Sequence, residues 1–294
     1  MLQVDRINRS FGSKRALTDV SFTVSGGRMT GFVGANGAGK TTTMRIILGV
    51  LSAESGEVTL DGRALDAASR RRFGYMPEER GLYPKMKVAE QIIYLARLHG
   101  LSPAAARRNT MVLLERLGLE ERANTSVESL SLGNQQRAQI AAALVHDPDV
   151  LVLDEPFSGL DPIAVEAVQG VLKDRAARGV PVLFSSHQLD IVERLCDDLV
   201  VIAEGTIRAF GSTDRLRTEY GGSQYDLVVP GSTEWVRQQP GITVVTIDGG
   251  HVVFTAESAD AAQAVLAHAI SRGPVFRFTP LEPSLAQLFR EVIQ

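Results

Sequence analysis

Two kinds of apolar pattern alternate along the first part of the chain, up to about residue 215. Near-continuous apolar runs, typical of buried strands, occur at 29–34, 149–156 and 180–187. Between them, at 88–100 and 164–179, apolar residues recur at helical spacing, and each stretch ends at a glycine. This alternation predicts α/β units around a mainly parallel sheet.

The segment 4–27 has a different pattern, in which short alternating strands are separated by turn residues. We expect it to form an antiparallel addition to the parallel sheet. At 217–226 the apolar pattern stops in a polar, glycine-containing stretch of the kind that joins domains. We therefore expect a first domain over 1–216, a linker over 217–224 and a second domain over 225–294.

The second domain has its own order of elements. The apolar pattern predicts a strand, a short helix, two strands joined at Gly249 and Gly250, a longer helix, a further strand and a final helix. Strand, helix, strand, strand, helix, strand is the order of the ferredoxin-like fold, for which about 70 residues suffice. The segment contains no cluster of catalytic side chains, so we expect a small accessory α+β domain.

The composition limits the partners. The 294 residues carry a formal net charge of -3, so we expect no nucleic acid, whose binding proteins usually carry a basic face. Cys196 is the only cysteine, which excludes an intrachain disulfide and favours a reducing compartment. The chain has no signal-peptide pattern and no apolar run near the roughly 18 residues of a membrane span, so a membrane role requires a partner.

The stretch GANGAGKT carries the first candidate chemistry. It matches the phosphate-binding pattern G-x-x-x-x-G-K-[ST] and lies between a predicted strand and a predicted helix, as that mechanism requires. Gly34, Gly37 and Gly39 allow backbone N–H groups to point inward, where the helix N-terminus adds partial positive charge. Lys40 can then reach the β- and γ-phosphates, and Thr41 can offer its hydroxyl to Mg²⁺.

A second candidate is the acidic pair Asp154 and Glu155, at the end of the predicted strand 149–156. Neighbouring side chains of a strand point to opposite faces, so the two carboxylates can have different roles. We predict that Asp154 serves Mg²⁺, directly or through a second layer of contacts, and that Glu155 orients and polarises the attacking water. The alternative is that the pair only caps the next helix.

In chain order, GANGAGKT, LSLGNQQR, VLVLDEP, SGLD and His187 together resemble the nucleotide-binding subunit of an ABC transporter. The resemblance covers residues 1 to about 215. It implies an α/β fold, the ABC cassette of the P-loop NTPases, with an antiparallel β subdomain and a helical subdomain. It also implies an ATPase that converts ATP and water to ADP and phosphate, with Mg²⁺ as cofactor.

The resemblance implies roles for individual residues. Ser131 and Gly133 match the family's signature, which closes on the γ-phosphate held by the second copy in a head-to-tail dimer. Asp161 matches the residue that couples the two sites, and His187 matches the histidine that contacts the γ-phosphate and holds base and water in register. Phe11 resembles the aromatic that stacks on adenine, or else it is a strand-edge core residue. The implied ATP-binding residues are Phe11, Gly34, Asn36, Gly37, Gly39, Lys40, Thr41, Thr42, Glu78, Ser131, Gly133 and Asp161, with Glu155 and His187 catalytic and Thr41, Asp154 and Glu78 as metal ligands.

Three positions depart from the family pattern. Glu78 stands where the family usually has glutamine; its carboxylate can still ligate Mg²⁺, but it repels the triphosphate unless the metal screens it. Leu132 replaces the usual glycine of the signature, and Asn134 the usual glutamine. Leu132 must point away from the phosphate if the site is to close.

The C-terminal segment resembles the extension of ATP-binding subunits in exporters whose transmembrane permease is a separate chain. This implies an ATPase that powers transport, most simply export, from the cytoplasmic face of the cell membrane, where the permease holds it. A soluble ABC ATPase that acts on ribosomes or nucleic acid is the alternative, but such proteins usually carry tandem cassettes or a coiled-coil insert, which are absent here. A GTPase switch or small-molecule kinase does not explain SLGNQQR followed by VLVLDEP, and a ligand-sensing C-terminal domain stays open.

Overall fold

The structure, a computed structural model, describes residues 1–79, 81–220, 224–281 and 284–293. The chain divides into two units, Met1–Thr213 and Asp214–Gln294. Residues 217–220 of the segment expected as a linker belong to helix α8 (Thr213–Tyr220), and 221–223 lie outside the described residues.

The first unit contains, within its described residues, a six-stranded sheet with the order β10-β9-β3-β8-β7-β6. All neighbours in it are parallel except β9 and β10, so the expected mainly parallel sheet is present. Strands β3, β7 and β8 are buried along their whole length, as their apolar runs predict. Their carboxyl ends meet at one edge of the sheet, where α/β proteins bind ligands. The strands are β3 (Met29–Val33), β6 (Phe73–Met76), β7 (Val150–Leu153), β8 (Val182–Ser185), β9 (Asp198–Ala203) and β10 (Thr206–Ser212).

A second, antiparallel sheet has the order β2-β1-β4-β5, which confirms the predicted antiparallel addition. Its strands are β1 (Leu2–Phe11), β2 (Lys14–Val24), β4 (Ser55–Leu60) and β5 (Arg63–Ala64). A continuous hydrophobic core joins this sheet to the parallel one through helix α1 (Lys40–Ile47), which contributes Met44 and Ile47. The rings of Phe22 and Phe32, one from each sheet, lie 5.3 Å apart in this core. Helix α1 is therefore held by both sheets at once.

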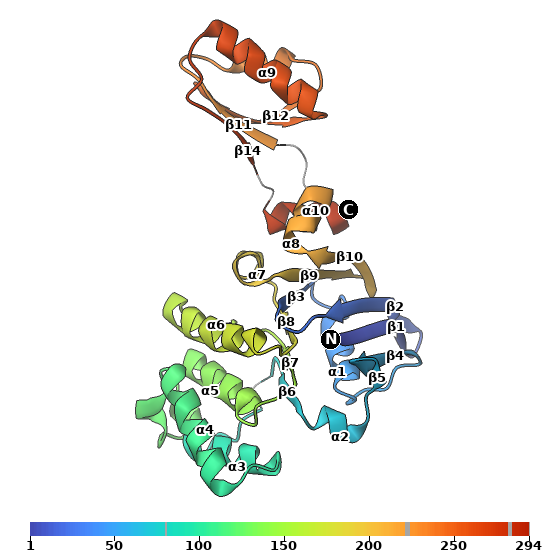
Figure 1. Cartoon of the computed structure of the whole chain (residues 1–294), viewed down its shortest axis with the longest axis vertical. Coiled ribbons are helices and arrows are strands. Elements are labelled where there is room, and N and C mark those ends of the chain that lie inside the picture. The colour runs from blue at the N-terminus through green and yellow to red at the C-terminus, as the bar shows by residue number, and fades with distance from the viewer. Residues whose placement is uncertain (80, 221–223, 282–283, 294) are drawn as a thin grey trace. The chain divides into compact units, whose positions relative to one another are not determined.

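Three further helices form a separate group in the first unit, and they are the expected helical subdomain. Figure 1 shows α3 (Val88–Leu98), α4 (Pro103–Arg116) and α5 (Leu132–Leu144) together, apart from the antiparallel sheet, and each of them packs on the other two. Ser102 starts α4 by accepting a hydrogen bond from the backbone N–H of Ala105, and proline at the first helical position suits that start. The remaining helical elements are α2 (Ala67–Arg70), α6 (Pro162–Ala177), α7 (Leu189–Leu195) and the 3₁₀ turns η1 (Glu120–Arg122) and η2 (Val127–Ser129).

The second unit contains a four-stranded antiparallel sheet with the order β12-β13-β11-β14 among its described residues. Numbered along the chain, this order is 2-3-1-4, the arrangement of a ferredoxin-like sheet, and α9 (Ala259–Arg272) packs on its apolar face through Val265. The predicted short helix is only a 3₁₀ segment, η3 (Glu234–Gln238). The other elements are β11 (Gln224–Val228), β12 (Ile242–Asp248), β13 (His251–Ala256), β14 (Arg277–Leu281) and α10 (Leu285–Ile293).

Candidate nucleotide-binding and catalytic site

The glycine-rich loop connects β3 to α1. Gly37 and Gly39 have positive φ angles of 80° and 112°, which a side chain would strain. Gly34 has another reason to be glycine, because a Cβ there would lie 2.4 Å from the carbonyl oxygen of Ile202. Lys40 is 8% exposed, and its ammonium donates hydrogen bonds to the carbonyls of Gly34 at 2.7 Å and Ala35 at 3.3 Å. The loop therefore holds a cation at the N-terminus of a helix, which is an environment for phosphate.

Asp154 lies at the carboxyl end of β7, between two hydroxyl groups. Thr41 Oγ1, in the first turn of α1, donates to Asp154 Oδ2 at 2.9 Å, and Ser185 Oγ, at the end of β8, donates to Asp154 Oδ1 at 2.5 Å. Asp154 is 1% exposed. Both of its oxygens are thus oriented by the chain, and one of them faces the predicted metal ligand Thr41.

Glu155 occupies the next position in an unusual backbone conformation. Its φ angle of 52° is in the left-handed region, which disfavours residues other than glycine and costs of order 1–3 kcal/mol. The backbone N–H of Glu155 donates to Ser185 Oγ at 2.8 Å, and its carbonyl accepts from Gln136 Nε2 of α5 at 2.8 Å. Its side chain approaches His187, with Oε2 lying 3.0 Å from Nδ1. Neighbouring elements therefore hold the strained residue in place.

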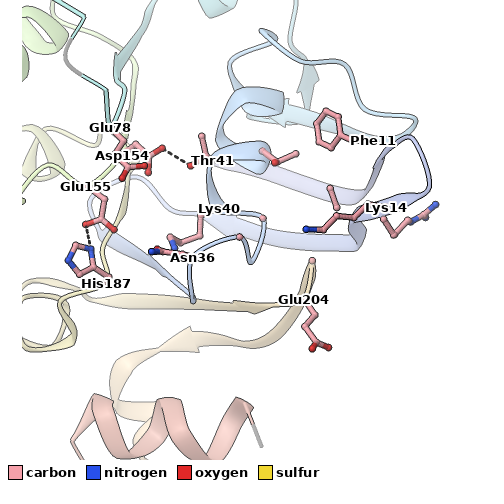
Figure 2. A pocket seen from close by; sticks show the side chains of 16 residues that line it. Phe11, Lys14, Asn36, Lys40, Thr41, Glu78, Asp154, Glu155, His187 and Glu204 are labelled. Atoms are coloured by element: carbon pink, nitrogen blue, oxygen red, sulfur yellow. Dashed lines mark hydrogen bonds and ion pairs between the residues drawn. The ribbon is translucent and has the colours of Figure 1, made fainter.

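One pocket, with a volume of about 750 Å³, brings most of the predicted residues together. In Figure 2, Lys40 and Asn36 lie on the glycine-rich loop, Glu78 lies beside Asp154 and Thr41, and the Glu155–His187 pair lies next to them. The predicted residues that line it are Phe11, Asn36, Gly37, Gly39, Lys40, Thr41, Thr42, Glu78, Asp154, Glu155 and His187.

The aromatic end of this pocket is formed by the hairpin of β1 and β2. Phe11 is 49% exposed, so it is not a core residue, and the Arg9 guanidinium carbon lies 5.1 Å from its ring centroid. Lys14 and Arg15 from the same hairpin also line the pocket, together with Glu204 on the turn between β9 and β10. These three charged residues are not among those predicted from the sequence; the basic pair beside Phe11 in the stretch FGSKR was the available signal.

Ser131, Gly133 and Asp161 are not among the residues that line this pocket. Ser131 caps α5 and accepts a hydrogen bond from the backbone N–H of Asn134 at 3.4 Å, whereas Asp161 caps α6 and accepts from Ala164 N at 2.8 Å. Leu132 is 58% exposed at the start of α5. The cap of the helix that follows the acidic pair is therefore Asp161, and Asp154 and Glu155 remain directed to the pocket.

Ser185 and Gln136 are further residues that the sequence analysis missed. Ser185 links both carboxylate-bearing residues, and Gln136 ties α5 to Glu155. The pairing of Leu153 with Phe184 in parallel register places Ser185 beside Asp154. The stretch FSS before His187 was therefore a usable signal once β7 and β8 were taken as neighbours.

Comparisons with known proteins agree with this geometry. The family described as "ABC transporter" matches residues 17–158, and the family described as "ATP-binding protein DrrA1-3-like, C-terminal domain" matches residues 211–293. The ABC transporter ATP-binding protein YhaQ of Bacillus subtilis (strain 168) is 36% identical over 293 residues, which cover 100% of this chain and 98% of YhaQ. The chain is a member of the ABC transporter ATP-binding proteins. As such, it is an ATPase with an ATP-binding cassette.

Two further relatives have named roles. The linearmycin resistance ATP-binding protein LnrL of Bacillus subtilis (strain 168) is 34% identical, over 80% of this chain and 76% of LnrL. The Nod factor export ATP-binding protein I of Paraburkholderia xenovorans (strain LB400) is 38% identical, over 73% of this chain and 72% of that protein. Both matches span most of the relative as well as most of this chain.

Solved structures show the same cassette fold. An ATP-binding subunit of an ABC transporter has 34% sequence identity and a TM-score of 0.70, and the match covers 75% of this chain and 93% of the other. The dimeric bacterial cassette MJ0796, at 24% identity and a TM-score of 0.67, shares the fold over 72% of this chain and 98% of its own. MJ0796 is dimeric in that structure, and cbiO1 of Clostridium perfringens, at 27% identity and a TM-score of 0.65, is part of the ABC transporter complex cbiONQ. None of the described helices of this chain is long and apolar enough to cross a membrane.

Proposed function

We propose that two copies of this chain pair head to tail, bind two ATP molecules between them, and use the hydrolysis of ATP to drive export through a separate transmembrane permease. The protein would then lie on the cytoplasmic face of the cell membrane, with 1–216 as the ATP-binding domain, 217–224 as the linker and 225–294 as the accessory domain. The names of LnrL and of the Nod factor export protein support export as the direction.

The proposal of a dimer rests on one observation: the residues predicted to bind ATP lie in two separate places on the chain. The pocket contains the glycine-rich loop, the acidic pair and His187, whereas Ser131 and Gly133, at the start of α5, are not among its lining residues. The N-terminus of α5 combines backbone N–H groups, a hydroxyl and the helix dipole, which together favour an anion. A second copy that presents its Ser131 to the pocket of the first supplies the missing donors. The Leu132 side chain is exposed, and Gly133 beside it is half-buried.

The residues at the pocket suit Mg²⁺ bound with the nucleotide. Thr41 and Asp154 place a hydroxyl and a carboxylate oxygen 2.9 Å apart, and the carboxylate of Glu78 lines the same pocket. Such oxygen donors suit a hard cation that also keeps phosphate oxygens and water as ligands. When bound, the ion neutralises charge on the β- and γ-phosphates. We assign Thr41, Asp154 and Glu78 to hold it.

The chain's own groups then perform the positioning that phosphoryl transfer requires. Lys40 donates to the phosphates and Phe11 stacks on adenine. Glu155 accepts a hydrogen bond from the attacking water and takes up its proton as the bond to the leaving ADP breaks. His187 fixes the orientation of the Glu155 carboxylate and reaches the γ-phosphate, and Asp161 couples the two sites of the dimer.

A Glu155→Gln variant tests the catalytic assignment. The change keeps the side-chain volume and the backbone bonds to Ser185 and Gln136 but removes the base. We expect it to bind ATP, to lose at least about a hundredfold in hydrolysis rate, and to elute as an ATP-dependent dimer in size-exclusion chromatography. Glu166→Gln, an exposed residue of α6, is the control and should behave as the wild type. Normal hydrolysis by Glu155→Gln would refute the assignment.

A mixing experiment tests the shared site. Lys40→Ala removes the phosphate-binding cation, and Ser131→Arg blocks the signature, so each variant alone should be inactive. In a heterodimer of the two, one of the two composite sites keeps both Lys40 and Ser131. Recovery of ATPase activity on mixing supports the head-to-tail dimer, and full activity of the wild type as a dilute monomer would contradict it.

A further inference from the structure

Gln139 is a buried polar residue in the middle of α5. It is 4% exposed, and its side-chain Nε2 lies 2.9 Å from the carbonyl oxygen of Pro77 and 3.1 Å from that of Glu79. Both partners are acceptors, so both hydrogens of the Gln139 amide group are used. The two carbonyls belong to the residues on either side of Glu78. A buried amide without partners is destabilising. An apolar residue would fill this position at less cost, which indicates that the two bonds are the reason for glutamine here.

The loop that Gln139 holds has little regular structure of its own. Pro77, Glu78 and Glu79 follow the end of β6 and belong to neither a strand nor a helix. The Glu78 side chain is exposed and lines the pocket beside Asp154, as Figure 2 shows. The direction of this carboxylate therefore depends on how the backbone on each side of it is fixed.

We propose that Gln139 is the positioning residue for Glu78: its amide fixes the loop so that the Glu78 carboxylate is directed to the metal ion beside Thr41 and Asp154. This inference rests on the proposed metal-binding role of Glu78. The same helix begins at Ser131, and its Gln136 holds the carbonyl of Glu155. Helix α5 thus connects the residue that faces the partner's nucleotide to two carboxylate residues of its own pocket.

The test measures metal affinity rather than turnover. Mn²⁺, whose free form gives an electron paramagnetic resonance signal, is titrated into the protein with a non-hydrolysable ATP analogue. Gln139→Met keeps the length of the side chain but removes both donors, and we expect Mn²⁺ affinity to fall about five- to tenfold. Gln135→Met is the matched control, because Gln135 on the same helix also donates to two carbonyls, those of Val127 and Leu130, ahead of α5. Its Mn²⁺ affinity should stay within about twofold of the wild type.

A second background separates positioning from a general structural role. If Gln139 acts through Glu78, then Gln139→Met has no further effect on Mn²⁺ affinity in a Glu78→Ala protein. The inference would be overturned if Gln139→Met lowers Mn²⁺ affinity equally in the wild-type and Glu78→Ala backgrounds. It would also be overturned if Gln139→Met and Gln135→Met have the same Mn²⁺ affinity. If the wild type binds the analogue but the complex binds no Mn²⁺, the proposed metal site is wrong, and the inference fails with it. Thermal unfolding of each variant confirms that the compared proteins are folded.

Discussion

Ser185 offers the sharpest test of how the acidic pair is held. Its hydroxyl donates to Asp154 Oδ1 at 2.5 Å and accepts from the backbone N–H of Glu155 at 2.8 Å, and the residue is fully buried. Ser185→Ala removes both bonds and leaves one buried carboxylate oxygen and one buried N–H without this partner. A hydrogen bond to a charged group is worth about 1.5–3 kcal/mol. If the activation barrier rises by this amount, kcat falls about ten- to hundredfold.

The neighbouring serine supplies the control. Ser186 is also buried, but its hydroxyl accepts from the backbone N–H of Gln188 at 3.0 Å and serves the start of α7 rather than the acidic pair. Steady-state ATP hydrolysis of Ser185→Ala and Ser186→Ala should therefore differ, with the larger loss of kcat in the former. ATP binding, followed by a fluorescent nucleotide, should change little in either, because Lys40 and Phe11 are untouched. If the two variants have the same kcat, the reasoning about Ser185 is wrong.

Three further predictions concern adenine stacking, the metal ion and pH. Phe11→Ala should weaken ATP binding about tenfold through lost stacking, whereas Tyr94→Ala, an aromatic of similar exposure on α3, should not; equal affinities in equilibrium titrations would refute the stacking role. Glu78→Gln removes a negative charge near the phosphates, so nucleotide affinity without divalent metal should rise while Mg²⁺ dependence weakens; a fall in metal-free affinity would contradict this. His146 stacks on His99 at 3.7 Å, and burial, followed by the charge of His99, lowers its pKa from 6.5 to about 4. At a pH between these two pKa values, the unfolded chain binds more protons at His146 than the folded chain does. The free energy of unfolding should therefore fall by about 2 kcal/mol from about pH 7.5 to about pH 5 through this residue alone. In urea titrations, the free energy of unfolding of His146→Phe should fall less than that of the wild type between the two pH values. Equal falls in the two proteins would contradict this assignment.

The sequence was enough to predict the sheets, because buried parallel strands and amphipathic helices have distinct periods. It also predicted the loop residues from Gly34 to Thr41, since their spacing is local. The roles of Ser185, Gln136 and Gln139 depend on contacts between segments far apart in the chain, and no spacing within one segment reveals them. The short helix expected in the second unit is only a 3₁₀ turn, because a five-residue segment is near the limit of what a helix can sustain.

The attachment of α1 to both sheets also bears on how long a nucleotide stays bound. A close-packed interior resists deformation, and beside the Ile202 carbonyl there is no room even for a Cβ at Gly34, so the glycine-rich loop cannot widen without shifting two layers of the protein. In a sandwich dimer, release of ADP then depends on separation of the two copies rather than on opening of the loop. The lifetime of the dimer, and not the affinity of the glycine-rich loop for phosphate, would therefore set the rate of the transport cycle.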